Sequence, residues 1–183
     1  ITFHTDLGRI FSMVVLGTGM VFLLVLLPFT FIEFFYAPWM QAQQEAATPR
    51  KLPEDTKGHV VLTQWDSVSA NLIKKLPTYG YEYVVMIPTL EEARELTELG
   101  IRVVLGDLDD PATYEAVRLK NAAVLAATGS DTSNTNATFT AREIAPEVRI
   151  ISTVSRESAK EVLQLSGVDQ VIHLPEMMGQ SLA

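Results

Sequence analysis

Small polar residues and their neighbours follow three of the short apolar segments of this sequence, and they are the side chains best suited to hold a ligand. The residues are Gln64, Asp66, Ser67 and Ser69 after the first segment, Asp107 and Leu108 after the third, and Thr128 and Gly129 after the fourth. Hydroxyl, amide and carboxylate groups can hydrogen-bond a small polar ligand, and glycine lets a ligand approach the backbone closely. The sequence therefore predicts a ligand site assembled from these three groups.

The first group departs from the glycine pattern of a dinucleotide-binding turn. Such a turn carries G-x-G-x-x-G, because glycines allow the tight turn and the close approach of the backbone to pyrophosphate. The three glycine positions hold Gln64, Asp66 and Ser69 here. Gln64 would crowd a phosphate, and Asp66 would repel it. Pro88 follows the second apolar segment and cannot bind ribose hydroxyls as the usual acidic residue does, so both standard dinucleotide anchors are missing.

Acidic residues gather at 107–110, after the third apolar segment. Carboxylate oxygens suit hard cations, but the spacing matches no recognisable metal motif and we expect no metal site. Asp110 precedes Pro111, which is typical of a helix N-cap followed by proline at the first helical position. For Asp107, a ligand-binding role and a structural role both remain open.

A catalytic constellation is not recognisable, and we expect the protein not to be an enzyme. His4, His59 and His173 stand far apart in the sequence and have no obvious catalytic partner. The chain has no cysteine, no Walker A loop and no nucleophile elbow. Its net charge of -8 argues against sequence-independent binding of nucleic acid, which needs clustered Lys and Arg.

Residues 10–35 form an apolar segment long enough to cross a membrane. A helix of this length reaches about 39 Å, against about 30 Å for the hydrocarbon core of a bilayer. A buried helix of a soluble protein is the alternative, whereas a signal peptide is disfavoured because no basic n-region or cleavage site flanks the segment. Positive charge is concentrated after the segment, which predicts a cytoplasmic C-terminal side. The basic residues are Arg50, Lys51 and Lys57 after it and Arg9 before it.

Two places in this segment are suited to bending, the Gly17-Thr18-Gly19 step and Pro28. Proline removes a helical hydrogen bond, and glycine either bends a helix or lets another helix pack closely, so hinge and packing roles remain open. Glu33, near the predicted cytoplasmic end, either concentrates cations at a pore mouth or is a solvated carboxylate at the interface.

The remainder of the chain predicts one α/β domain at residues 58–183, joined by a linker at 41–57 to the membrane segment at 1–40. Short apolar runs alternate with amphipathic stretches, which is typical of βαβ units. We expect strands at 60–62, 83–87, 102–105, 123–127, 150–154 and 170–173, with helices at 68–76, 90–99, 112–117, 134–144 and 159–165. These elements predict a Rossmann-like, doubly wound parallel sheet in the order 3-2-1-4-5-6. We also expect the first part of the linker to continue as a helical neck.

Several blocks of the sequence resemble potassium channels whose inner pore helix runs into an RCK (TrkA-N-like) domain. Residues 5–9 resemble the stretch after a potassium selectivity filter, and Gly19 falls where that family keeps its gating-hinge glycine. In the soluble part the resemblance rests on 106–107, 126–128, 167–172, Pro175 and 179–183. It covers nearly the whole chain.

The resemblance implies a tetramer whose RCK domains pair into a ring and pull on the inner helices when a small-molecule or ion effector binds. It further implies potassium as the transported ion and an inner-membrane protein, in contact with the lipid bilayer, whose RCK domain is cytoplasmic. Asp107 would touch the effector, and NAD or an adenine nucleotide could bind through Asp66, Ser67, Asp107 and Thr128 without the glycine motif. Calcium-gated relatives pair that Asp with two Glu on the fifth strand, where residues 152–155 here read Ser-Thr-Val-Ser. A calcium site of that design is therefore not expected.

Two other functions remain open on the sequence. A regulatory subunit of a potassium or other cation transporter would use the same domain without a selectivity filter of its own. A membrane-tethered NAD(P)-dependent enzyme would carry a further catalytic domain after Ala183. We expect the chain to be a piece of a longer protein, and the sequence before Ile1 would separate the channel from the transporter subunit.

Overall fold

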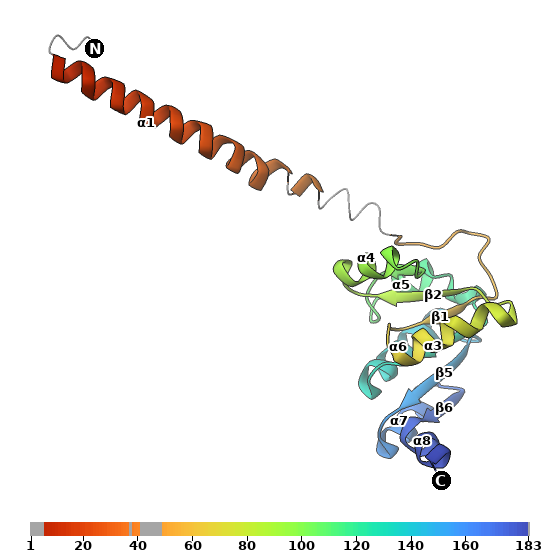
Figure 1. The fold of residues 1–183 in the computed structure, drawn as a ribbon. Helices are drawn as coiled ribbons and strands as arrows, with labels where there is room; N and C mark the ends of the chain where they lie inside the picture. The colour runs from red at the N-terminus through yellow and green to blue at the C-terminus, as the bar shows by residue number, and fades with distance from the viewer. Residues whose placement is uncertain (1–5, 37, 41–48, 183) are drawn as a thin grey trace. The chain divides into compact units, whose positions relative to one another are not determined.

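The computed structural model of this chain describes residues 6–36, 38–40 and 49–182. The chain divides into two compact units, Ile1–Ala47 and Thr48–Ala183. The first contains the apolar helix and the second is the α/β unit (Figure 1). His4 and the predicted helical neck at 41–48 lie outside the described residues.

The first unit is built on helix α1, Asp6–Phe31, which continues as a π-helical turn, η1, at Ile32–Tyr36. No side chain of α1 is buried, and Asp6–Met40 is long and apolar enough to cross a membrane, with a mean hydropathy of 2.6. The helix is long enough to cross the hydrocarbon core of a bilayer. The prediction of an N-terminal candidate membrane helix is therefore confirmed.

The two glycines of the predicted bend lie inside α1. A Cβ atom added to Gly17 or Gly19 would have no neighbour within 4 Å, so neither glycine is needed for packing within this chain. Pro28 also lies inside the helix. The hinge at Gly19 stays a prediction.

The second unit contains a six-stranded, all-parallel sheet in the order β3-β2-β1-β4-β5-β6. The strands are β1 Val60–Leu62, β2 Tyr83–Ile87, β3 Val103–Leu105, β4 Val124–Ala127, β5 Arg149–Val154 and β6 Gln170–His173. The predicted doubly wound topology is confirmed, with strand boundaries that differ by at most one residue. All three residues of β1 are buried, because a parallel strand in the middle of such a sheet is covered on both faces.

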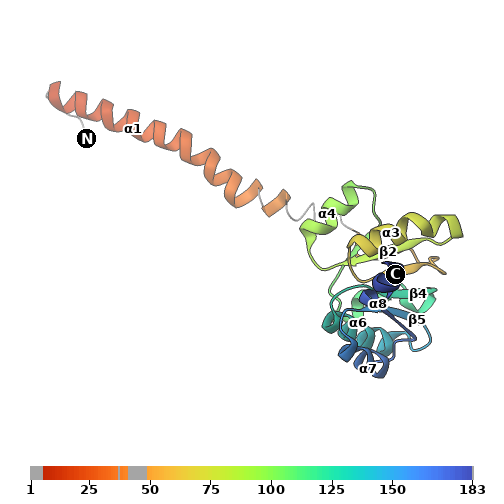
Figure 2. The ribbon, with the colours of Figure 1, turned by 60° about the horizontal axis from the view of Figure 1, so that its bottom comes forward.

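Helices cover the two faces of the sheet unequally. Helices α3 Ser67–Lys75 and α4 Leu90–Glu98 pack on one face, and α5 Pro111–Ala116, α6 Asp131–Ile144 and α7 Glu157–Leu165 pack on the other. Figure 2 shows α3 and α4 on one side and α6 and α7 on the opposite side. The two resulting cores are separate, one around Leu62 and Ile87 and the other around Leu125 and Ile150.

Two helical features differ from the sequence-based expectation. Helix α6 begins at Asp131, three residues before the predicted start, because Ser130 caps it and its Oγ accepts a hydrogen bond from the Ser133 N–H. Helix α8, Leu174–Leu182, was not predicted, since Pro175 and Gly179 lower the helical propensity of that segment. Proline near the start of a helix costs no hydrogen bond, so Pro175 is compatible with this helix.

The second half of the predicted linker lies against the α/β unit. The Leu105 N–H donates to the Pro49 carbonyl (3.0 Å), the Leu52 N–H to Ala116 (2.9 Å) and the Gly58 N–H to Asn121 (2.7 Å). The Leu52 side chain also packs on the core beneath α5. These contacts fix residues 49–58 to the α/β unit, whereas the division of the chain into functional domains stays a prediction.

An apolar groove of about 420 Å³ runs over β1, β4, β5 and β6 on the face that carries α3. It is lined by the strand residues Val124, Ala126, Ile151, Thr153 and Ile172 together with Leu72 of α3. In the part of the chain that is described, α3 and α4 cover only the half of this face that lies toward β3. The other half therefore presents apolar side chains to solvent.

Candidate functional site

The predicted ligand crevice lies where strand order reverses, between β1 and β4. Leu62 pairs with Ala126 across these two strands, so the turns that follow them leave the same edge of the sheet side by side. In doubly wound sheets this switch point is where ligands bind. Gln64 and Asp66 come from the first turn, and Thr128 and Gly129 from the second.

Gln64 connects the two turns. Its Nε2 lies 3.1 Å from an Asp66 carboxylate oxygen and 3.3 Å from the Thr128 carbonyl oxygen, and it donates to both. A Cβ atom at position 129 would lie 3.1 Å from Gln64 Oε1, so Gly129 leaves the space that this side chain uses. The position of the first motif glycine is therefore occupied by a side chain that crosses the crevice.

Asp66 and Ser69 form a capping box at the start of α3. The Ser69 N–H donates to Asp66 Oδ1 at 2.7 Å, and the Asp66 N–H donates to Ser69 Oγ at 2.7 Å. Ser69 is buried, while Ser67, the first residue of the helix, is exposed. In a dinucleotide-binding turn the free N–H groups at the helix start would bind the pyrophosphate, but here the Asp66 carboxylate already accepts from one of them, the Ser69 N–H.

The second turn is held by residues that the sequence did not single out. Asn134 is fully buried, and its side chain accepts from the Gly129 N–H (2.8 Å) and donates to the carbonyl oxygens of Gly129 (3.1 Å) and Thr153 (2.8 Å). The Thr128 N–H donates to Thr63 Oγ1 at 3.3 Å. The sequence shows Asn134 only as a polar residue in the first turn of a predicted helix. Helix capping explains such a residue equally well, so the sequence did not predict its role in the second turn.

Thr128 carries an unsatisfied polar atom in the crevice. Its Oγ1 is buried and has no hydrogen-bond partner among the described residues. Buried hydroxyls in folded proteins nearly always have a partner, so an unsatisfied one at a ligand crevice is suited to hydrogen-bonding a ligand. Thr128 also lines the apolar groove, which places this hydroxyl at the end of an apolar surface.

The third predicted group lies apart from the other two. Asp107 and Leu108 follow β3, which is separated from β1 by β2. Asp107 is exposed, and the Leu108 carbonyl accepts a hydrogen bond from the buried Tyr114 hydroxyl at 2.7 Å. Burial raises the pKa of Tyr114 and the nearby Asp109 carboxylate raises it further, so the hydroxyl remains a donor. Leu108 thus has a structural role, while Asp107 is free to face a ligand that extends from the crevice.

Two other acidic residues near these turns, Asp110 and Asp131, are engaged within the fold. Asp110 caps α5 by accepting from the Ala112 N–H at 2.9 Å. Asp131 is nearly fully buried and accepts from the Ser155 N–H (2.9 Å) and from Arg156 Nε (3.2 Å). Burial raises the pKa of Asp131, but the hydrogen bonds from Ser155 and Arg156 outweigh that effect and hold the pKa below its usual value.

Neither described histidine belongs to the crevice. His59 is buried and its Nε2 lies 2.8 Å from the Val117 carbonyl; burial lowers its pKa despite this hydrogen bond. His173 Nδ1 lies 3.3 Å from a Glu157 carboxylate oxygen. Among the residues that the structure describes, no group of three or more His, Cys, Asp or Glu side chains is placed to hold a metal ion.

The crevice therefore suits a ligand that hydrogen-bonds Thr128, and its residues do not fit a pyrophosphate in the usual position. Gln64 fills the space between the turns, and Asp66 places a negative charge at the α3 N-terminus. Phosphates of a bound nucleotide would have to lie elsewhere or displace Gln64. The geometry thus agrees with the altered pocket that the missing glycines predict.

Comparison with known proteins identifies the family. The family model of the TrkA-N domain matches residues 60–174, which include all six strands. No curated protein matches the chain.

The solved structures similar to this chain include channels and isolated domains. The GsuK channel bound to NAD is 33% identical, with a TM-score of 0.71, and the match covers 100% of this chain and 33% of that one. GsuK bound to ADP has the same identity and TM-score, with 48% of its chain covered. The TrkA-N domain of the inner membrane protein ybaL from Escherichia coli is 22% identical, with a TM-score of 0.64 and coverage of 70% and 96%, and shows the fold alone.

This chain spans between a third and half of the length of the GsuK chains that it matches. The alignment with GsuK includes the apolar helix as well as the α/β unit, since it covers the whole chain. The family match over residues 60–174 shows that the chain belongs to the TrkA-N domain family, as its resemblance to RCK proteins predicted.

Proposed function

We propose that this chain is part of a subunit of a ligand-gated potassium channel. In this proposal α1 is the inner pore helix, and the α/β unit senses a nucleotide or ion and opens the pore through that helix. The observation that carries it is the order of parts along one chain, a candidate membrane helix followed by a TrkA-N domain, which aligns over its full length with the GsuK channel.

The effector binds in the crevice between β1 and β4. Two observations support this location, the unsatisfied Thr128 hydroxyl and the exposed Asp107 at the same edge of the sheet. NAD and an adenine nucleotide are the effectors to test first, because GsuK structures contain NAD and ADP. Gln64 and Asp66 must move, or the phosphates must bind away from the α3 N-terminus.

Self-assembly into a homotetramer with paired RCK domains is the second part of the proposal. The apolar groove over β4, β5 and β6 on one face and the exposed Phe139, Val162 and Leu165 of α6 and α7 on the other support it, because exposed apolar side chains of this kind occur at protein interfaces. Basic residues after α1 support a cytoplasmic α/β unit on an inner-membrane channel.

A regulatory subunit of a cation transporter is the alternative. The structural similarity to a TrkA-N domain of an inner membrane protein agrees with it at the level of the fold. An enzymatic role has less support, because the histidines of the described chain have structural partners and lie away from the crevice.

Potassium flux through the purified full-length protein tests the proposal. The protein would be reconstituted into liposomes loaded with potassium, and efflux would be measured with and without NAD, ADP or a divalent cation in the bath. We expect potassium-selective flux that at least one of these compounds changes. Absence of flux from a tetrameric protein that still binds a nucleotide would favour the transporter subunit instead.

A further inference from the structure

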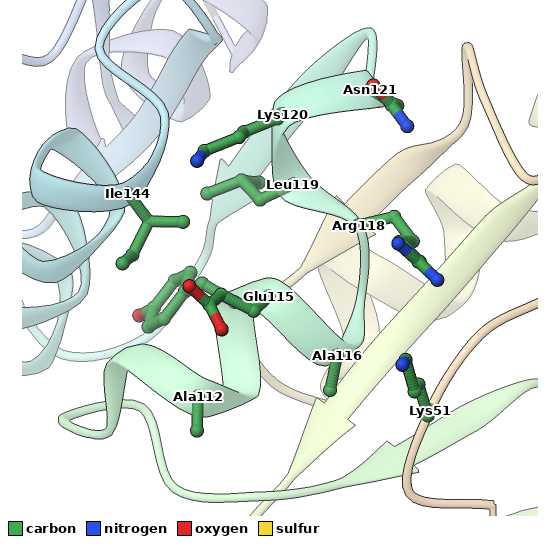
Figure 3. A pocket seen from close by; sticks show the side chains of 10 residues that line it. Lys51, Ala112, Glu115, Ala116, Arg118, Leu119, Lys120, Asn121 and Ile144 are labelled. Atoms are coloured by element: carbon green, nitrogen blue, oxygen red, sulfur yellow. The ribbon is translucent and has the colours of Figure 1, made fainter. Parts of the chain in front are cut away.

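A second concavity lies far from the crevice, at the edge of the sheet where β4 begins. It has a volume of about 470 Å³ and lies between the segment around Lys51, helix α5, the turn η3 at Leu119–Asn121 and Ile144 at the end of α6 (Figure 3). The crevice lies at the opposite edge, because helix α6 runs from the end of β4 back toward the start of β5. A ligand here would not compete with one in the crevice.

Three of the side chains that line this pocket are cationic. They are Lys51, Arg118 and Lys120, and the one acid among the lining residues is Glu115. Three positive charges against one negative leave the lining with an excess of positive charge, on a chain whose net charge is -8. Arg118 also pairs with the highly exposed Glu54 carboxylate at 3.1 Å, a contact that solvent screens.

These cations come from two segments that the fold holds together. The hydrogen bond from the Leu52 N–H to the Ala116 carbonyl ties the segment containing Lys51 to the end of α5. Figure 3 shows the Lys51 and Arg118 side chains on the same side of the pocket. Attraction to the negative end of a helix would account for Arg118 and Lys120, which follow α5, but not for a lysine 67 positions before Arg118 in the sequence.

The backbone conformation at position 118 does not explain why the residue there is arginine. Its φ of 55° is the one positive φ at a non-glycine residue in the described part of the chain. Glycine or asparagine would adopt this left-handed backbone more readily. Its Nε is buried and has no hydrogen-bond partner among the described residues, so the guanidinium has an unused donor beside the pocket.

We propose that this pocket binds a phosphate-bearing anion, with Arg118, Lys51 and Lys120 as the binding residues. A guanidinium can hold two phosphate oxygens at once and lysine adds point charges, which together form a common phosphate-binding set. The volume is sufficient for a phosphorylated headgroup or a small phosphate ester. The phosphate belongs either to an anionic lipid of the membrane that α1 crosses or to a soluble compound.

Hydrogen exchange of the full-length protein in nanodiscs tests the site and separates the two sources. The amides of residues 115–121 would be followed in phosphatidylcholine nanodiscs, in the same nanodiscs with inorganic phosphate at constant ionic strength, and in nanodiscs that contain phosphatidic acid. Slower exchange of these amides with inorganic phosphate would identify a soluble ligand. Slower exchange only with phosphatidic acid would identify a lipid headgroup.

Two variants and one control complete the test. Lys51→Gln removes a charge from an exposed side chain, and Arg118→Asn removes the guanidinium while keeping a residue that tolerates φ of 55°. We expect both to abolish the slower exchange, and Arg102→Gln, which removes an exposed arginine paired with Glu82, to leave it unchanged. Unchanged exchange of 115–121 under both conditions would overturn the proposal. Protection that survives in both pocket variants, or that is lost in the Arg102 control, would overturn it as well.

Discussion

At the scale of single residues, the turns at this edge of the sheet depend on a carboxylate and a glycine that other residue types could not replace without loss of stability. The charge of Asp131 is needed because the residue is only 7% exposed and its oxygens accept hydrogen bonds from Ser155 and Arg156. These bonds connect the start of α6 to the turn after β5. Gly106 is needed because it follows β3 and lies against Thr113 of α5, which leaves no space for a side chain.

Replacing Asp131 with Asn is expected to make stability less dependent on pH. The pKa of Asp131 is lower in the folded protein than in the unfolded chain, so ionisation stabilises the fold above the unfolded value, about pH 4. That stability is lost as the pH falls through the folded pKa. We therefore expect Asp131→Asn to lower the melting temperature at pH 7, and the difference from the unmodified chain to shrink below about pH 4.

Thermal unfolding of the detergent-solubilised chain between pH 3 and 7 measures this difference. Asp55→Asn is the control, because Asp55 is an exposed carboxylate. A difference that persists undiminished to pH 3 would show that the carboxylate acts by shape and not by charge.

Replacing Gly106 with Ala is expected to destabilise the α/β unit by about 1–3 kcal/mol, as overpacking does. The new Cβ would lie 2.7 Å from Thr113 Cγ2 and 3.0 Å from Thr113 Cβ, closer than van der Waals contact allows. Gly179→Ala in α8 is the matched control, since its Cβ would meet nothing within 4 Å. The melting temperatures of both variants provide the measurement, and equal values would contradict the predicted clash.

At the scale of elements, the start of α3 determines what the crevice can accept. The capping box of Asp66 and Ser69 binds the N–H groups that a phosphate would otherwise use, and Gln64 spans the gap to β4. The same backbone N–H groups can therefore either be capped by Asp66, which stabilises α3, or bind an anion.

Replacing Asp66 with Asn should separate capping from charge. Asparagine caps helices about as well as aspartate, so we expect little loss of stability, whereas Asp66→Ala should cost about 1 kcal/mol. Removal of the negative charge should increase the thermal stabilisation that ADP gives, relative to that given by adenosine. Asp110→Asn is the control, because Asp110 caps α5 in the same way away from the crevice. An ADP effect that is equal in Asp66→Asn and the unmodified chain would show that Asp66 does not oppose phosphate.

At the scale of the whole molecule, a candidate membrane helix and a TrkA-N domain occur in one chain. Residues 49–58 are hydrogen-bonded to the α/β unit, so they move together with it. In the proposed channel, a small change at the ligand site would become a larger motion of this unit. The proposed hinge at Gly19 is where such a motion would bend the helix.

Replacing Gly19 with Ala should weaken the response to ligand. The added methyl group has open space within the chain, so the variant should fold, while the higher helical propensity of alanine, by about 1 kcal/mol, stiffens the helix. We expect a lower open probability and a smaller change on adding ligand in single-channel recordings. Gly17→Ala, two residues earlier and equally open, is the control. Unchanged gating in Gly19→Ala would remove the hinge from the mechanism.

Much of the fold could be predicted because its signals are local. Runs such as 60–62 and 83–87 are short, apolar and rich in β-branched residues, which favours buried strands, and Asp110 before Pro111 indicates a helix start. The helix at 174–182 escaped prediction because proline and glycine weaken the periodic signal. The predicted site residues are partly brought together, with Gln64, Asp66, Thr128 and Gly129 in contact and Asp107 two strands away.

An apolar helix of spanning length, a doubly wound sheet and a first turn without glycines could all be predicted from the sequence, because hydrophobic period and residue type are local properties. Only the folded chain shows that Gln64 reaches Thr128, that Asn134 ties the second turn to Thr153 and that Lys51 lies beside Arg118. The partners Gln64 and Thr128, Asn134 and Thr153, and Lys51 and Arg118 are 64, 19 and 67 residues apart in the chain. Contacts between such residues follow from strand order and helix packing, which no local pattern encodes.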